Sequence, residues 1–303
     1  MKLGSRVLRA SVSVGLLLGL VWWLDVGVVV SRLSEMRLEW VMLAIAISVV
    51  QVAVLAWRWR FTAGRLGVAL AFSAAWREYY LSIFLNQVLP GGVLGDVSRG
   101  WRHVRAQTHF AAPGGPAMRA VIVERLSAQG VMTAVAVVSL LVLPMTLESG
   151  SWQGVFAAGV AAVLLVVATL IWIRQSFSSS LPARVLADLG EAHQSGLAFV
   201  AQVASAALVV GTYLTTYLAA ARAVGVETPL PVFLPLVAPV LMTMLIPVTV
   251  AGWGLREGAA AVLWEAVGLT AADGIVVSVA YGLLVLLCSL PGGVVLLLRP
   301  RRP

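Results

Sequence analysis

Two interruptions in an otherwise apolar chain most constrain its fold, and the first covers residues 86–102. Its backbone-breaking residues are Pro90, Gly91, Gly92 and Gly95. Its charged side chains are Asp96, Arg99 and Arg102. A bilayer cannot hydrogen-bond free backbone groups, so a break at membrane depth must be enclosed by protein or line a wet cavity. Charges at that depth are costly and indicate a functional site.

The second interruption, residues 246–257, repeats the pattern of the first. The matching positions, 157 residues apart, are Pro90 and Pro247, Gly95 and Gly252, and Arg99 and Arg256. Gly254 and Glu257 complete the second break. Breaks at corresponding positions in two halves of a chain are a sequence signal for the binding site of a transporter.

The composition is that of a protein with several membrane spans. The 303 residues are 60% hydrophobic and 11% charged, with a mean hydropathy of +0.97, whereas soluble domains are about a quarter charged. The net charge of +8 comes almost entirely from arginine. In a membrane protein this excess sets topology and contacts anionic headgroups, so we expect no nucleic-acid partner. One cysteine and three histidines without helical pairing predict no disulfide, metal or cofactor.

Six long apolar runs predict full membrane spans, near residues 12–30, 40–57, 119–143, 152–173, 196–221 and 274–298. Two topologies compete for the broken segments between them. If those segments cross the membrane, many arginines fall outside, against the positive-inside tendency. If they are re-entrant hairpins, most arginines lie in the cytoplasm, including Arg58, Arg60 and Arg65 after the second span. We therefore expect an all-α protein with six full spans, two re-entrant hairpins and both termini in the cytoplasm.

This topology makes the chain one transmembrane domain, 1–303, with inverted repeats at about 1–145 and 146–303. The first hairpin enters from the cytoplasm and the second from outside. The two halves are then related by a pseudo-two-fold axis in the membrane plane. Pro90 and Pro247 should approach each other near the midplane.

The breaks resemble those of the lysylphosphatidylglycerol synthase transmembrane-domain family. The resemblance rests on three groups of residues: Asn86, Leu89, Pro90, Gly95, Asp96 and Arg99; Glu124 and Arg125; and Pro247 followed by Gly252 to Glu257. It extends over nearly the whole chain in helix order. Larger members join this domain to a soluble aminoacyltransferase, while the membrane part flips the lipid. Since we expect no such soluble domain here, the resemblance implies lipid translocation without the synthase reaction. At the second break, Ala251 stands where the family pattern has a glycine.

The candidate substrate-binding residues are the polar side chains at the breaks and in the following span: Asn86, Asp96, Arg99, Arg102, Glu124, Arg125, Arg256 and Glu257. Arginine offers a fork of donors that matches phosphate oxygens, so Arg99 and Arg256 are expected to bind an anionic headgroup as a pair. The alternative is that Asp96–Arg99, Glu124–Arg125 and Arg256–Glu257 are structural ion pairs. Asn86 either contacts the headgroup or caps backbone groups at the break.

The expected function is a lipid transporter in the cell inner (plasma) membrane that moves a phospholipid or a polyprenyl-phosphate-linked lipid between leaflets. No ATP-binding motif is present, so transport is downhill or coupled to protons or ions. The candidate proton carriers are Glu78, Asp96, Glu124 and Glu257. The alternatives are an integral membrane enzyme, or a scaffold for a glycosyltransferase or synthase partner, in the synthesis of lipid-linked glycans or aminoacyl lipids.

Overall fold

The computed structural model describes residues 26–89, 93–106, 115–143, 180–246 and 249–298, and all its elements in these ranges are helices. Four of the helices are long and apolar enough to cross a membrane. They are α3 (Leu38–Arg65), α6 (Pro116–Val142), α9 (Gly196–Ala223) and α12 (Ala271–Leu297). These helices match four of the six expected spans. The expected span at 152–173, and that at 12–30 up to the start of α2 (Val26–Ser34), lie outside the described residues.

Short helices flank each of the two breaks. At the first break, α4 (Phe72–Val88) contacts α5 (Leu94–Ala106). At the second break, α10 (Leu230–Met242) continues into the 3-10 helix η2 (Thr243–Leu245), and both contact α11 (Leu255–Ala266). The helix–break–helix pattern expected at both places is therefore present. The expected approach of Pro90 to Pro247 concerns residues that lie outside the described part of the chain, as do Gly91 and Gly92.

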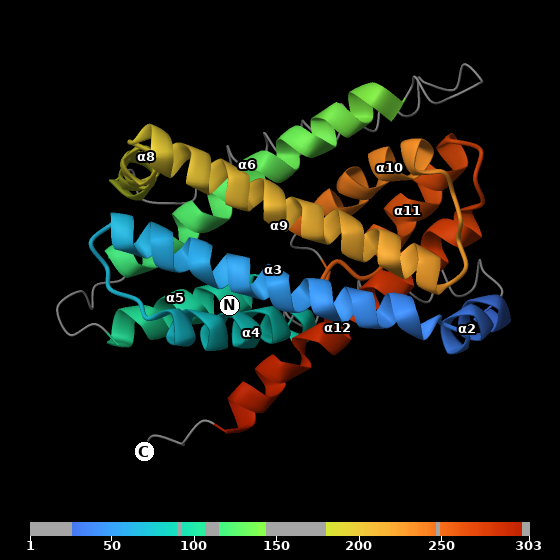
Figure 1. Ribbon diagram of the computed structural model, residues 1–303, viewed down its shortest axis with the longest axis horizontal. Helices are drawn as coiled ribbons and strands as arrows, with labels where there is room; N and C mark the ends of the chain where they lie inside the picture. Colours follow the sequence, from blue (N-terminus) through green and yellow to red (C-terminus); the bar gives the residue numbers. More distant parts are fainter. Residues whose placement is uncertain (1–25, 90–92, 107–114, 144–179, 247–248, 299–303) are drawn as a thin grey trace.

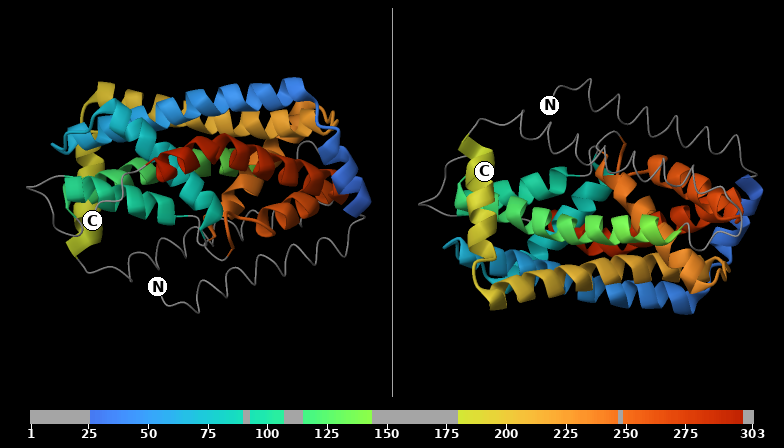
Figure 2. Two further views of the ribbon diagram at one scale, coloured as in Figure 1. Left: turned by 90° about the horizontal axis from the view of Figure 1, so that it is seen from below. Right: turned by 90° about the horizontal axis from the view of Figure 1, so that it is seen from above.

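The helices before and after residue 150 pack against each other in a reciprocal way. Helix α3 lies beside α9 and runs in the opposite direction (Figure 1). Helix α4 packs on α12, and α6 packs on α10 (Figure 2). The helices α3, α4, α5 and α6 thus have counterparts of the same order and similar length in α9, α10, α11 and α12.

Helix α3 corrects one expectation about topology. It continues beyond the expected end of the span at Trp57 as far as Arg65, and Arg58 is 0% exposed. Arg58 therefore does not belong to a cytoplasmic loop that fixes topology. It is turned into the bundle because polar groups on α6 and α9 accept its hydrogen bonds.

Two ion pairs join the outer helices to the bundle at its opposite ends. Arg32 of α2 pairs with Asp273 at the start of α12. Arg119 at the start of α6 pairs with Asp188 of α8 (Ser180–Ala192). Figure 1 shows α2 and α8 at the two ends. In the first pair the outer helix, α2, carries the arginine, whereas in the second pair the outer helix, α8, carries the aspartate.

Basic side chains gather at the end of the bundle where α8 lies. This end contains the end of α3, the start of α4, the end of α5 and the start of α6 (Figure 1). Its basic residues are Arg60, Arg65, Arg77, Arg102, Arg105, Arg119 and Arg184, and its acidic residues are Glu78, Asp188 and Glu191. At the opposite end, the described acidic residues outnumber the described basic ones: Glu35, Glu39, Glu227, Glu265 and Asp273 against Arg32, Arg37 and Arg222.

Glycines allow three helix pairs to approach closely. A Cβ atom at Gly292 of α12 would lie 2.1 Å from the carbonyl oxygen of Tyr80 on α4. A Cβ at Gly95 would lie 2.0 Å from the carbonyl oxygen of Ser82, and one at Gly274 would lie 2.7 Å from that of Ala260. Backbone atoms cannot move aside as a flexible side chain can, so these positions require glycine for α4–α12, α4–α5 and α11–α12 packing.

Candidate functional site

The first break is held together by the amide of Asn86. Its Oδ1 accepts a hydrogen bond from the backbone N–H of Gly95 at 2.7 Å, at the start of α5. Its Nδ2 donates to Asp96 at 3.0 Å. The side chain therefore has the capping role, and it also orients the carboxylate of Asp96. A backbone donor at a helix start is one of the groups that the helix itself leaves unsatisfied.

Five ionisable side chains from α3, α5 and α6 meet beside this break and form what we call the N-terminal charge cluster. They are Arg58, Asp96, Arg99, Glu124 and Arg125. Arg99 is its centre, 0% exposed, with Nη2 lying 3.0 Å from Asp96 and 3.2 Å from Glu124. Its guanidinium carbon also lies 3.9 Å from the ring centre of Tyr79 and 4.4 Å from that of Trp59. Arg99 is thus enclosed by two carboxylates and two aromatic faces.

Glu124 is fully buried, and its partners are residues other than its neighbour in sequence. Its Oε2 accepts from the Tyr79 hydroxyl at 2.6 Å and from Arg99. Its Oε1 lies 3.9 Å from Nε of Arg58. The alternative in which Glu124 pairs with Arg125 is therefore wrong, because consecutive residues in the interior of a helix project in different directions.

Arg125 contacts Asp96 instead, and it is the member of the cluster that reaches open space. Its Nη2 lies 2.7 Å from Oδ1 of Asp96, and its side chain is 37% exposed. Asp96 also accepts from Ser82 at 3.1 Å. The partly exposed guanidinium of Arg125 is therefore held by a carboxylate that has hydrogen-bond partners of its own.

At the second break, Arg256 and Glu257 form the ion pair that the structural alternative predicted, here called the C-terminal pair. Arg256 donates to Oε1 of Glu257 at 2.7 Å, and both side chains are almost fully buried. Ser278 of α12 accepts from Arg256 and donates to Glu257, each at 2.9 Å. The other oxygen of Glu257 accepts from the backbone N–H of Gly254 at 2.6 Å. The carboxylate thus caps α11 while it neutralises the arginine.

The backbone of the second break has an unusual conformation. Gly252 and Gly254 have φ of +81° and +88°, which favours glycine. Ala251 also has a positive φ, +51°, although it carries a Cβ. Few residues other than glycine adopt this region, so the Ala251 backbone is held there at some cost by its surroundings.

A cavity of about 240 Å³ lies between two sets of helices, those before residue 150 and those after it. Its wall comes from α3, α4 and α6 and from α9, α10, η2 and α12. Its polar lining residues are Ser48, Gln51, Asn86, Gln87, Arg125, Gln129, Tyr213, Thr216, Tyr281, Cys288 and Ser289. Within the described part of the chain, Arg125 is its sole charged lining residue. The cavity is thus a largely apolar chamber with several neutral polar side chains, one guanidinium and no carboxylate in its described wall.

The structure separates the predicted site residues into three groups. Arg125 and Asn86 line the cavity. Asp96, Arg99, Glu124, Arg256 and Glu257 are buried and do not line it. Arg102 lies apart and pairs with Glu78 at 2.6 Å. The helix-break residues Gly95, Gly252 and Gly254 are described, whereas Pro90, Gly91, Gly92 and Pro247 are not.

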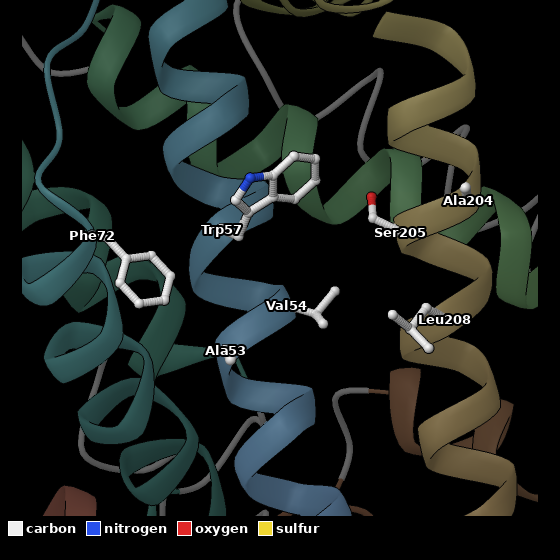
Figure 3. A pocket seen from close by; sticks show the side chains of 7 residues that line it. All are labelled: Ala53, Val54, Trp57, Phe72, Ala204, Ser205 and Leu208. Carbon is white, nitrogen blue, oxygen red and sulfur yellow. The ribbon is translucent and has the colours of Figure 1, made fainter. Parts of the chain in front are cut away.

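A second hollow lies on the outside of the α3–α9 pair (Figure 3). Trp57 and Phe72 lie on one side of it and Leu208 on the other, and all three are exposed. Among its described lining residues, Ser205 carries the one hydroxyl group. This apolar groove suits hydrocarbon and not a charged headgroup, so it is distinct from the chamber around Arg125.

Sequence reasoning missed several members of the site. Arg58, Tyr79 and Gln202 are buried and hydrogen-bonded within it. One available signal for Arg58 was its place between Trp57 and Trp59 at the end of an apolar run, where an arginine needs a buried partner. The hydroxyl of Tyr79 on α4 donates to Glu124 on α6, a contact that no local pattern specifies.

The family model described as "Lysylphosphatidylglycerol synthase TM region" matches residues 9–292. No curated protein and no solved structure matches the chain.

Proposed function

Because the chain belongs to the lysylphosphatidylglycerol synthase TM region family, we propose that it moves an anionic amphiphile between the leaflets of a bilayer. Membership indicates a lipid-related membrane protein. The observation that carries the finer proposal is the chamber between the two helix sets, with Arg125 as its charged lining residue. A phospholipid headgroup or a polyprenyl-phosphate-linked headgroup would supply the anion that this guanidinium can bind.

We propose that the two helix sets are the halves of an inverted-topology repeat with six spans and two re-entrant hairpins. Three features support this: the matching order and length of the helices, the opposite directions of α3 and α9, and the reciprocal packing of α4 on α12 and α6 on α10. A cavity at the interface of such repeats is the usual place for substrate.

The same proposal places the α8 end of the bundle in the cytoplasm and the protein in the inner (plasma) membrane. The support is the excess of arginine at that end, which the positive-inside tendency assigns to the cytoplasm. It also gives both termini a cytoplasmic location.

Within this proposal, the guanidiniums have different roles. Arg99 and Arg256 were expected to bind the headgroup directly as a pair. Their burial, and their pairing with acids, favours a positioning role. Arg99 holds Asp96, and Asp96 in turn holds Arg125 at the cavity wall. Asp96 is also the acid best placed to couple transport to a proton, because adding a proton would weaken its hold on Arg125. Glu78, Glu124 and Glu257 remain further candidates for such coupling.

A vesicle assay tests the function. The purified chain is reconstituted with a fluorescent anionic phospholipid, and an impermeant reductant then bleaches the label in the outer leaflet. We expect protein-dependent bleaching of the inner-leaflet pool, slowed roughly tenfold, or about 1.4 kcal/mol, by Arg125→Gln. The matched control is Arg37→Gln, which removes an exposed arginine. Failure to move any anionic lipid, or equal rates in the two variants, would contradict the proposal. Chemical conversion of the lipid would instead support an enzyme.

A further inference from the structure

Among the residues that the structure describes, the charges beside the cavity do not balance, and positive charge is in excess. The N-terminal charge cluster contains three guanidiniums, Arg58, Arg99 and Arg125, but only two carboxylates, Asp96 and Glu124. With all five groups ionised, one positive charge remains. The C-terminal pair is neutral, since Arg256 and Glu257 compensate each other. Arg102 and Glu78, which lie apart, also compensate each other.

The excess charge can be assigned to one side chain. Arg58 and Arg99 are fully buried, and each contacts Glu124. Arg125 shares Oδ1 of Asp96 with Arg99, and Asp96 is the single carboxylate that Arg125 contacts among the described residues. It is also the one member of the cluster that combines 37% side-chain exposure with a place in the cavity wall. A guanidinium that is not fully neutralised at membrane depth requires water or an anion.

The rest of the chamber is suited to a small neutral group beside that anion. Its amides and hydroxyls, such as those of Gln51, Gln87, Gln129 and Thr216, carry no charge. Its volume of about 240 Å³ lies below the range of about 300–1,000 Å³ that is usual for pockets that enclose a small molecule. It can therefore hold the polar part of a lipid and not a long glycan.

We infer that this chamber takes a headgroup with a single negative charge, a phosphodiester, in contact with Arg125, and disfavours phosphomonoesters and diphosphates. The inference rests on the proposed function and narrows its substrate. Phospholipids with neutral headgroup alcohols and polyprenyl-monophosphate sugars are such diesters. A second negative charge would find no second guanidinium on the described wall, and would be left uncompensated in a medium of low dielectric constant.

The experiment uses Cys288, the only cysteine of the chain, which lines the same cavity. The full-length protein in detergent is treated with a thiol reagent in the presence of short-chain phosphatidylglycerol, phosphatidic acid or farnesyl diphosphate. Each labelling rate is divided by the ligand-free rate at the same pH. At pH 8 we expect phosphatidylglycerol to protect Cys288 at concentrations roughly tenfold lower than the other two probes.

The charge of phosphatidic acid can be changed within the same experiment, because a phosphomonoester loses its second proton near pH 6. Its protection of Cys288 should improve at pH 5.5, where it carries one charge, and weaken at pH 8. Phosphatidylglycerol keeps one charge throughout, so any titration of the protein itself would appear with this probe as well. A phosphatidic acid profile that follows that of phosphatidylglycerol would overturn the inference.

Two variants complete the test. Arg125→Gln should remove protection by phosphatidylglycerol. Gln129→Arg, one helical turn from Arg125 and on the same wall, should shift the preference toward phosphatidic acid at pH 8, a result that damaged folding would not produce. Equal protection by all three probes in the unmodified protein refutes the single-charge inference while vesicle transport stands. Protection by phosphatidylglycerol without any vesicle transport supports this inference and refutes the proposed function.

Discussion

Arg125 donates to the same oxygen of Asp96, at 2.7 Å, that Arg99 contacts at 3.0 Å. This shared acceptor connects a fully buried arginine to one on the cavity wall. The two guanidiniums differ in their exposure and partners, so their substitution should have different effects.

Arg99→Gln should lower the stability of the protein. It would remove the buried guanidinium that contacts both Asp96 and Glu124, and breaking a buried ion pair costs about 3–5 kcal/mol. Unfolding in detergent, followed by heat or denaturant, measures the change. Arg37→Gln, at an exposed pair with Glu39, is the control and should change stability by less than about 1 kcal/mol. A stable Arg99→Gln protein that binds no lipid would restore the direct headgroup role for Arg99.

Arg125→Gln should affect lipid movement more than stability. Asp96 keeps Arg99, Ser82 and Asn86 as partners, so the loss of stability should be smaller than for Arg99→Gln. The rate of lipid movement in vesicles should nevertheless fall roughly tenfold. Melting curves and vesicle rates measured on the same preparations separate the two effects. Parallel loss of stability and transport in both variants would argue for one structural role.

The sign of the cavity potential can be measured through Cys288. An anionic methanethiosulfonate reagent should label it several-fold faster than a cationic one of similar size, because Arg125 attracts the anion. The ratio should fall toward unity in Arg125→Gln. Ala204→Cys in a Cys288→Ser background, in the outer apolar groove, is the control and should show no such preference. Faster labelling of Cys288 by the cation would contradict the charge assignment.

Gly292→Ala should destabilise the α4–α12 contact, since the added Cβ would lie 2.1 Å from the carbonyl oxygen of Tyr80. Overpacking of this kind costs about 1–3 kcal/mol. Gly211→Ala on α9 is the matched change, because nothing lies within 4 Å of its added Cβ. It should leave stability unchanged or raise it by up to about 1 kcal/mol. Equal melting temperatures for the two variants would show that α4 and α12 do not pack as described.

The Arg119–Asp188 pair should tolerate exchange. Each single reversal, Arg119→Asp or Asp188→Arg, places like charges together and should destabilise the protein. The double variant should recover most of the loss, with a coupling of about 1 kcal/mol or more because the pair is largely buried. A double-mutant cycle on thermal stability gives this coupling directly. No recovery in the double variant would mean that the reversals act through other contacts.

The long spans could be predicted because their apolar runs are continuous, as the agreement of α6, α9 and α12 with the expected ranges shows. The contacts between side chains on distant helices could not be predicted from the sequence. Arg58 bonds to Gln202 and Ser205, about 145 residues away, and no local pattern specifies that contact.

Helix geometry could have improved one part of the sequence-based prediction of the site. Glu124 and Arg125 are consecutive in the interior of a helix and cannot face each other. Arg256 and Glu257 are also consecutive, yet they pair, because Glu257 turns back to cap the first turn of α11. The position of a pair within its helix thus decides whether neighbours meet.

The two ion pairs with exchanged charges differ in their contact with solvent. The side chains of Arg32 and Asp273 are 41% and 28% exposed, whereas those of Arg119 and Asp188 are 14% and 10% exposed. Dissolved ions screen exposed pairs far more than buried ones. Under the proposed topology the exposed pair faces the outside, so a rise in external ionic strength would loosen that end of the bundle first. The two ends, although built alike, would then respond differently to the salinity of the medium.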